Sequence, residues 1–162
     1  FLSTWDRLCW HIQRIDVARI LWLHRHGGVY ADMDVQAVRS IAPHLTHPVM
    51  VAANSARHAR LRNCRTGVCG RHNGNWLMAS VPHHPLWIEH MRYVTDRVDE
   101  FCAQNDVISG VAELTGPYAL ARVLASSAFR DDVGFFSLNP PFATVRFTAR
   151  WFKHTKERRA TE

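Results

Sequence analysis

Two aspartates separated by one residue, Asp32 and Asp34, are the side chains of this sequence best suited to chemistry. They follow the β-prone residues 29–31, and residues two apart in an extended segment point the same way, so both carboxylates are expected on one side of a strand end. With no basic residue beside them the charges repel, and the usual remedies are a divalent cation, a shared proton or exposure to water. Oxygen ligands select hard cations such as Mg²⁺ or Mn²⁺. A cation held by one or two carboxylates keeps positions open for phosphate oxygens, which suits chemistry on a diphosphate.

A helix that ends in a glycine pair precedes the two aspartates and must position them. Apolar residues recur at helical spacing from residue 12 to residue 22 without an intervening Gly or Pro, which predicts a helix. Gly27 and Gly28 are expected to end it, because glycine readily takes the left-handed conformation of a helix C-terminus. Within this helix Asp16 and Arg19 lie three residues apart and share a face. Three acidic side chains and one arginine are therefore expected to converge near the helix end and the strand end.

Three segments, taken in order along the chain, carry a recognisable spacing. They are Gln13-Arg14-x-Asp16-x-x-Arg19-x-x-x-Leu23-x-x-x-Gly27-Gly28-Val29-Tyr30-x-Asp32-x-Asp34-Val35, then Asn75, Met78-Ala79-Ser80, Pro82 and His84-Pro85, and then Thr115-Gly116-Pro117. The first closely resembles the DXD region of glycosyltransferase family 32, which includes fungal Golgi α-1,6-mannosyltransferases and inositol phosphoceramide mannosyltransferases. A bare Asp-x-Asp is common by chance, whereas the whole run, with both glycines and the upstream Asp and Arg, is highly specific. The second and third segments resemble later motifs of the same family.

The resemblance covers roughly residues 12–124 and implies an α/β fold of the GT-A type, the fold of nucleotide-diphospho-sugar transferases. The alternation of predicted helices and strands favours α/β layering independently. Family members carry an N-terminal strand that forms part of the nucleoside pocket, and its signature is missing here, so the fold is expected to be incomplete at the N-terminus. We expect residues 1–150 to form a partial GT-A catalytic domain and residues 151–162 to form a basic, frayed tail.

By the same resemblance, the functional residues gather around the two aspartates. Asp34 would bind the metal directly, while Asp32 would bind the ribose or sugar of the donor and reach the metal through water. The implied cofactor is Mn²⁺ or Mg²⁺. The implied catalytic residues are Asp32 and Asp34, which also form the metal site, and the implied donor-binding residues are Asp16, Arg19, Gly28, Asp32 and Asn75.

Several of these residues also have structural explanations. A helix ion pair between Asp16 and Arg19 would contribute only about 0.3–0.5 kcal/mol and would not require the glycines and aspartates downstream, so the donor-site role is favoured. Helix termination explains Gly28 without any approach to a donor. Asn75 either bonds a sugar hydroxyl or caps a helix that starts at Trp76, and the residue types leave both readings open.

The resemblance implies a metal-dependent, retaining hexosyltransferase. It would move a hexose, mannose above all, from GDP-mannose or a UDP-hexose to a glycan or sphingolipid acceptor. It would work at the lumenal face of a Golgi or other secretory-pathway membrane, with membrane association through segments outside this chain. The alternative is a non-catalytic relative that binds nucleotide sugars or carbohydrate. An Asp-x-Asp phosphohydrolase is not supported, because the order of Asp and Lys motifs that such an enzyme needs is absent.

The composition fits one ordinary globular domain of 162 residues, with 47% hydrophobic and 21% charged residues. The formal net charge of +6 favours anionic partners. Nucleic acid is not expected, because the basic residues are spread out and the densest cluster, in residues 153–159, lacks interleaved aromatics. No apolar run reaches the length of about 18 residues that a transmembrane helix needs. Cys64 and Cys69 flank a turn-like spacing, which fits a disulfide in an oxidising lumen and two unpaired thiols equally well.

The remaining pattern predicts the framework around these motifs. Tyr30 alternates in direction with the neighbours of the aspartate pair and is expected to pack in the core. The expected elements are a buried strand over residues 48–53, a surface loop over 55–72, an amphipathic helix over 85–101, a helix over 118–125, and short strands over 135–138 and 144–147.

Overall fold

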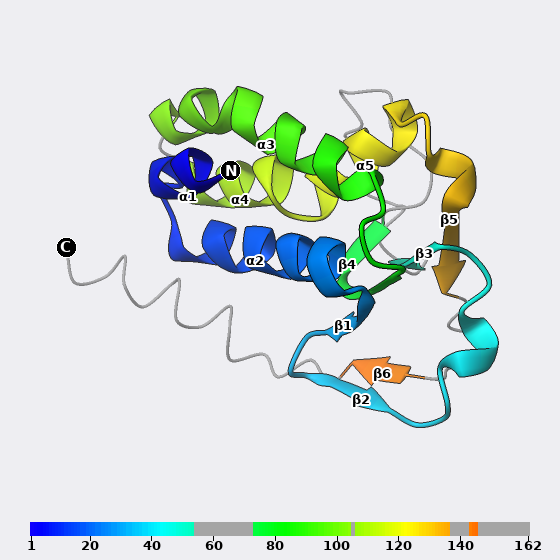
Figure 1. The fold of residues 1–162 in the computed structure, drawn as a ribbon. Helices are drawn as coiled ribbons and strands as arrows, with labels where there is room; N and C mark the ends of the chain where they lie inside the picture. The colour runs from blue at the N-terminus through cyan, green and yellow to red at the C-terminus, as the bar shows by residue number, and fades with distance from the viewer. Residues whose placement is uncertain (54–72, 105, 137–142, 146–162) are drawn as a thin grey trace.

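The computed structural model describes residues 1–53, 73–104, 106–136 and 143–145, which fold as helices beside a mixed sheet (Figure 1). The helices are α1 (Leu2–Arg7), α2 (His11–His26), α3 (Leu86–Ala103), α4 (Val107–Leu114) and α5 (Pro117–Ser126). The strands are β1 (Gly28–Ala31), β2 (Val35–Ala37), β3 (Val49–Ala53), β4 (Asn73–Ser80), β5 (Val133–Phe136) and β6 (Ala143–Val145). Short 3₁₀ turns cover Ala42–His44 and Arg130–Asp132. The α/β class predicted from the sequence is confirmed.

The strands form two sheets that meet at the aspartates. The main sheet has the order β1-β4-β3-β5, in which β4 runs antiparallel to both β1 and β3, and β3 runs parallel to β5. Strand β2, which follows β1 in the chain, belongs to a second sheet. It pairs there antiparallel with β6, with Val35 opposite Val145. Figure 1 shows the helices gathered above the main sheet, and the β2–β6 pair below β1. Residues 32–34 therefore connect one sheet to the other.

The glycine pair ends α2, as predicted. The backbone N–H of Gly27 donates to the Leu23 carbonyl at 2.8 Å, and the φ angles of Gly27 and Gly28 are +65° and +87°. A Cβ atom on Gly27 would lie 2.7 Å from the backbone nitrogen of Pro82 and 2.8 Å from the Ser80 carbonyl oxygen. Glycine is thus required at position 27 for both its conformation and its small size. This close approach fixes the end of α2 against the β4–α3 connection.

The main core lies between α2, α3, α5 and the sheet. Trp87 of α3 is 0% exposed, and its indole nitrogen donates to the Ser80 hydroxyl at 2.8 Å. Tyr30 packs against this core, as predicted. The predicted strand over 48–53 and the predicted helices over 85–101 and 118–125 correspond to β3, α3 and α5. No helix in the described part of the chain is long and apolar enough to cross a membrane.

The predicted helix start at Trp76 is wrong, because this residue lies inside strand β4. A short apolar run has the same appearance in a buried helix and in a central strand, and β4 is paired on both sides. Strand β5 begins earlier than predicted, at Val133, and β6 ends at Val145 within the described residues. The predicted loop over 55–72, the cysteines at 64 and 69 and the predicted tail over 151–162 lie outside the described residues.

A disulfide that the sequence analysis did not anticipate joins Cys9 to Cys102. It ties the connection between α1 and α2 to the C-terminal turn of α3, across a sequence separation of 93 residues. Cross-linking positions so far apart restricts the unfolded chain, because it closes a large loop. The Arg7–Asp99 ion pair joins the same two regions at the surface.

Removing this disulfide should lower the free energy of unfolding by about 2–4 kcal/mol, which urea denaturation measures. Cys9→Ser, Cys102→Ser and the double variant should show the same loss, since each change breaks the same bond. Additive losses in the double variant, or a double variant as stable as the wild-type chain, would contradict the assigned pairing.

A second feature of the core is His90 on α3, which is 1% exposed. Neither ring nitrogen has a hydrogen-bond partner among the described residues. Burial lowers the pKa of His90 from 6.5 to about 4, because a charged imidazolium loses its hydration there. The side chain is therefore neutral in the folded protein at pH values where the unfolded chain already binds a proton.

Replacing His90 by Leu should remove part of the acid sensitivity of the protein. Between pH 6.5 and about 4 the unfolded state binds the His90 proton and the folded state does not, so stability falls as the pH falls. The linkage amounts to roughly 3 kcal/mol over that window. Unfolding free energies measured across this range should fall less steeply for His90→Leu than for the wild type or for the exposed control His11→Gln. Parallel curves for all three proteins would refute the prediction.

Candidate active site

Three polar side chains of α2 face the protein interior. Gln13, Asp16 and Arg19 are 0%, 4% and 8% exposed, and their spacing places them on one stripe of the helix. Buried polar groups are stable only where partners are supplied. Gln13 meets this need by accepting hydrogen bonds from the N–H groups of Cys9 and Trp10 and donating to the Gly110 carbonyl at 3.2 Å. The other two side chains find partners on the sheet and on the α4–α5 connection.

Asp16 is the central acceptor of this polar network. Its Oδ1 accepts a hydrogen bond from Asn75 Nδ2 at 3.2 Å and forms an ion pair with Arg19 Nη2 at 2.9 Å. Its Oδ2 accepts one from the Thr115 hydroxyl at 3.0 Å. Burial raises the pKa of Asp16 to about 6, although the positive charge of Arg19 and the donors Thr115 and Asn75 oppose the rise. The carboxyl group is therefore ionised at neutral pH and depends on these donors.

Arg19 links Asp16 to the segment that follows β1. Its Nη1 donates to Asp32 Oδ1 at 3.2 Å and to the Asn75 carbonyl at 3.0 Å, while Nη2 bonds Asp16. Its guanidinium carbon lies 4.7 Å from the centre of the Tyr30 ring, a cation–π distance. The Arg19 side chain is 7% exposed. One buried cation thus holds two carboxylates, and the structure brings Asp16, Arg19 and Asp32 together.

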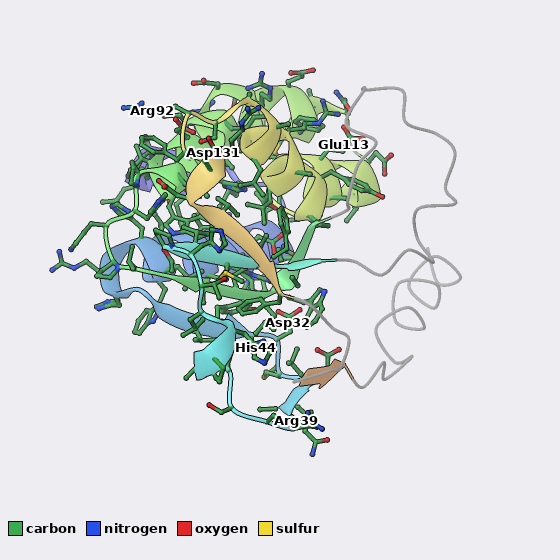
Figure 2. All side chains as sticks on the ribbon, turned by 90° about the vertical axis from the view of Figure 1, so that its right-hand side faces the viewer. Asp32, Arg39, His44, Arg92, Glu113 and Asp131 are labelled. Atoms are coloured by element: carbon green, nitrogen blue, oxygen red, sulfur yellow. A yellow bond between two sulfur atoms is a disulfide. The ribbon has the colours of Figure 1, made fainter. Side chains whose placement is uncertain are left out.

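Asp32 is held through one of its two oxygens. The Tyr30 hydroxyl donates to Asp32 Oδ1 at 2.6 Å, and Arg19 bonds the same atom. Burial, together with the hydrogen bond to Asp32, raises the pKa of Tyr30, so the phenol stays protonated and remains a donor. The other oxygen, Oδ2, makes no hydrogen bond to the described residues, and the Asp32 side chain is 34% exposed. Figure 2 shows Asp32 between the main sheet and the β2–β6 pair.

The expectation that the two aspartates share one side of an extended strand end is wrong. Met33 and Asp34 form a turn, which the bond from the Val35 N–H to the Asp32 carbonyl closes at 2.9 Å. The chain must turn here because β2 belongs to a different sheet from β1. The assumption that no basic group lies beside the aspartates is also wrong, since Arg19 approaches from α2.

Of the other predicted site residues, Asn75 joins the polar network, whereas Asp34 and Gly28 do not. Asn75 belongs to the polar network through both its side-chain amide and its carbonyl, and it does not cap a helix. Asp34 is exposed in the turn and bonds none of the described residues. Gly28 is exposed, and a Cβ atom there would meet nothing within 4 Å, so its positive φ explains the glycine better than lack of space does.

Two members of the network were not among the predicted site residues. The sequence predicts Tyr30 only as a core residue, and Thr115 only as part of the third family-like segment. The signal for Thr115 was its place in the third family-like segment, Thr115-Gly116-Pro117. The signal for Tyr30 was its position two residues before Asp32 in a strand, where both side chains point the same way.

The chemistry of the aspartates fits a hard divalent cation. Asp34 and the open Oδ2 of Asp32 are oxygen donors, which Mg²⁺ and Mn²⁺ prefer. Within the described residues, no group of three or more His, Cys, Asp or Glu side chains is arranged to hold a metal ion. A cation here would therefore depend on one or two carboxylates, with water and phosphate oxygens filling its other positions.

Comparison with known proteins identifies the relatives of this chain. Residues 1–55, which contain α2, β1 and both aspartates, match the family model of the glycosyltransferase sugar-binding region containing a DXD motif. Inositol phosphoceramide mannosyltransferase 3 of Schizosaccharomyces pombe is 38% identical over 55 residues, or 34% of this chain and 15% of that protein. Mannosyl phosphorylinositol ceramide synthase SUR1 of Saccharomyces cerevisiae is 30% identical over 92 residues, or 57% of this chain and 20% of that protein.

A third relative extends the similarity along the chain. The uncharacterized glycosyltransferase L373 of Acanthamoeba polyphaga mimivirus is 27% identical over 141 residues, or 87% of this chain and 46% of that protein. In each case the matched part spans less than half the length of the relative. The predicted resemblance is confirmed: the part of the chain that contains both aspartates matches the DXD family model, and the relatives include inositol phosphoceramide mannosyltransferases.

Replacing Arg19 by Met should lower the unfolding free energy at about pH 8 by about 3–5 kcal/mol, because the charge on Asp16 stays buried without its cation. The loss should shrink toward about pH 5, since a carboxyl group with a raised pKa becomes neutral there and no longer needs the cation. Urea denaturation at both pH values measures the effect.

The matched control is Arg122→Met. Arg122 pairs with Glu113 at 3.1 Å, but the two side chains are 32% and 37% exposed, so its loss should stay within about 1 kcal/mol. The prediction is contradicted if both variants lose the same unfolding free energy, or if the loss in Arg19→Met does not depend on pH. Either result would show that Arg19 does not compensate the buried charge of Asp16.

Proposed function

We propose that this chain carries the donor site of a metal-dependent glycosyltransferase of the GT-A type. The enzyme would transfer a hexose, mannose in the first instance, from GDP-mannose or a UDP-hexose to a glycan or sphingolipid acceptor. One observation carries the proposal: a buried Asp16–Arg19–Asp32 network ends in an exposed aspartate turn, inside the region that matches the DXD family model. The mannosyltransferase names of the relatives support the choice of sugar.

The aspartate turn would act on the diphosphate of the donor. Breaking the glycosidic bond builds negative charge on the leaving phosphate oxygens. When bound, a divalent cation supplies Lewis-acid stabilisation of that charge. We assign metal binding to Asp34 and to the open oxygen of Asp32, while Tyr30 and Arg19 keep Asp32 oriented through its other oxygen.

The buried side of the network would face the donor sugar. Asn75 gives its amide N–H to Asp16, so its side-chain oxygen is the atom left to accept a hydrogen bond from a sugar hydroxyl. Asp16 Oδ2 has one donor, Thr115, and a carboxylate oxygen accepts two. The Nη atoms of Arg19 already contact Asp16, Asp32 and the Asn75 carbonyl. The role of Arg19 in binding the nucleotide sugar would therefore be to hold these groups in place.

The broader assignments rest on the family resemblance. We infer that residues 1–150 belong to one catalytic domain followed by a basic tail, and that the transfer retains configuration at the sugar. We also infer from the resemblance that the protein works at the lumenal face of a Golgi or other secretory-pathway membrane. The Cys9–Cys102 disulfide supports an oxidising compartment of that kind.

A thermal-shift titration with GDP and with UDP, each with and without Mn²⁺, tests the donor site. A ligand at about 100 times its dissociation constant adds about 2.7 kcal/mol to stability, which raises the Tm of a domain of this size by about 5–10 °C. One nucleotide should produce this shift with the wild-type chain when Mn²⁺ is present. Asp34→Ala should abolish the shift, because the turn loses its exposed metal ligand.

Asp131→Ala is the matched control for that experiment. The Asp131 side chain is 94% exposed, like an ordinary surface carboxylate, and lies well above Asp32 in Figure 2. It should keep the full shift. A Mn²⁺-dependent shift that survives in Asp34→Ala would refute the assigned metal ligand. A shift without Mn²⁺-dependent hydrolysis of any nucleotide sugar would favour the non-catalytic alternative.

A further inference from the structure

Thr115 connects the end of the α4–α5 hairpin to the polar network. It lies between α4 and α5, is 2% exposed, and its hydroxyl donates to Asp16 Oδ2 at 3.0 Å across a sequence separation of 99 residues. The bond joins the third family-like segment to the first. None of the sheet strands contributes to this contact, so it fixes the helical layer to the site directly.

The hydroxyl proton of Thr115 has two acceptors within reach, and the geometry favours Asp16. The Val111 carbonyl lies 3.3 Å from the hydroxyl, but it already accepts the backbone N–H groups of Thr115 at 3.2 Å and of Gly116 at 2.8 Å. Asp16 is closer and negatively charged, and hydrogen bonds to charged groups are the stronger kind. The single proton is therefore committed to the carboxylate.

The two oxygens of the Asp16 carboxylate differ in how much they depend on the Thr115 hydroxyl. Its Oδ1 has two partners, the Asn75 amide and the Arg19 guanidinium, whereas the described residues offer Oδ2 only the Thr115 hydroxyl. Without that hydroxyl, half of a buried carboxylate would lack a hydrogen bond, and rotation of the carboxylate would misalign its bond to Arg19. Arg19 in turn orients Asp32. The aspartate turn keeps a second support, because the Tyr30 hydroxyl also donates to Asp32 Oδ1.

We propose that Thr115 is a positioning residue of the donor site, which sets the orientation of the Asp16 carboxylate toward the donor sugar. The role rests on the proposed function. This role concerns the sugar end of the donor rather than its diphosphate end, because the Thr115 hydroxyl bonds Asp16 and the Val111 carbonyl rather than a residue of the aspartate turn. Turnover of the sugar donor should therefore depend on Thr115 more than binding of the bare nucleoside diphosphate does.

Thr115→Val, which keeps the shape and removes the hydroxyl, tests the role. The substrate is whichever of GDP-mannose and the UDP-hexoses the wild-type chain hydrolyses with Mn²⁺. We expect kcat/KM for this hydrolysis to fall by about tenfold or more, which corresponds to the loss of one hydrogen bond to a charged group. The thermal shift with Mn²⁺ and the matching nucleoside diphosphate should stay within about 1 °C of the wild-type shift. Thr115→Ser restores the hydroxyl and should recover most of the lost kcat/KM.

Thr95→Val provides the matched control. Thr95 also loses hydroxyl contacts, to the Met91 carbonyl at 2.8 Å and to Thr4 at 2.8 Å, but these lie on α3 facing α1. Its kcat/KM should match the wild type. The proposal is overturned if Thr115→Val hydrolyses the donor as well as an active wild type does, or if Thr115→Ser fails to recover activity. A wild-type chain that neither binds a nucleotide with Mn²⁺ nor hydrolyses a donor would overturn the proposed function, and the Thr115 role with it.

Discussion

The structure depends on one buried guanidinium placed between two carboxylates. Arg19 bonds Asp16 on its own helix and Asp32 after the next strand, and its side chain is 7% exposed. Asp16 without the cation would leave a charge in surroundings that solvate it poorly, which is costly. The cation without the two carboxylates would be equally unfavourable. Helix, strand and turn can therefore not shift independently, because each shift would separate buried opposite charges.

The fold satisfies this constraint through the close contact at the end of α2. Gly27 approaches the backbone of Pro82 and the Ser80 carbonyl too closely for any Cβ atom, so α2 and the end of β4 are fixed relative to each other. The chain then enters β1, which pairs with β4 in a register that places Tyr30 opposite Met78. This pairing carries Asp32 to Arg19 and brings Asn75, near the start of β4, to the same point. The disulfide at Cys9 and the bond from Gln13 to the Gly110 carbonyl hold the N-terminal end of α2.

Local rules predicted the parts of this arrangement that involve neighbours in sequence. The helix over α2, its end at Gly27 and the shared face of Asp16 and Arg19 all follow from spacings of three or four residues. The rest depends on partners far along the chain. Asn75 was taken as a possible cap because its strand is recognisable only from pairing with β1 and β3. The turn at Asp34 follows from β2 joining β6, a pairing that no local pattern reveals. Thr115 reaches Asp16 of α2 and Cys102 reaches Cys9 just before that helix, from sequence separations of 99 and 93 residues, and nothing in their own neighbourhoods specifies these contacts.

The two aspartates of the motif end up with different freedom, which bears on how the proposed enzyme would use a metal. Asp32 is fixed by Tyr30 and Arg19, whereas Asp34 is exposed and bonds none of the described residues. The network of Asp16, Arg19 and Asp32 carries one net negative charge, and Asp34 adds a second beside it. Such a pair attracts a divalent cation but offers too few ligands to bind it tightly alone. The diphosphate would complete the coordination, so metal and donor would bind cooperatively, each supplying what the other needs. A fixed aspartate gives that assembly its position, and a free one lets it form without straining the buried network.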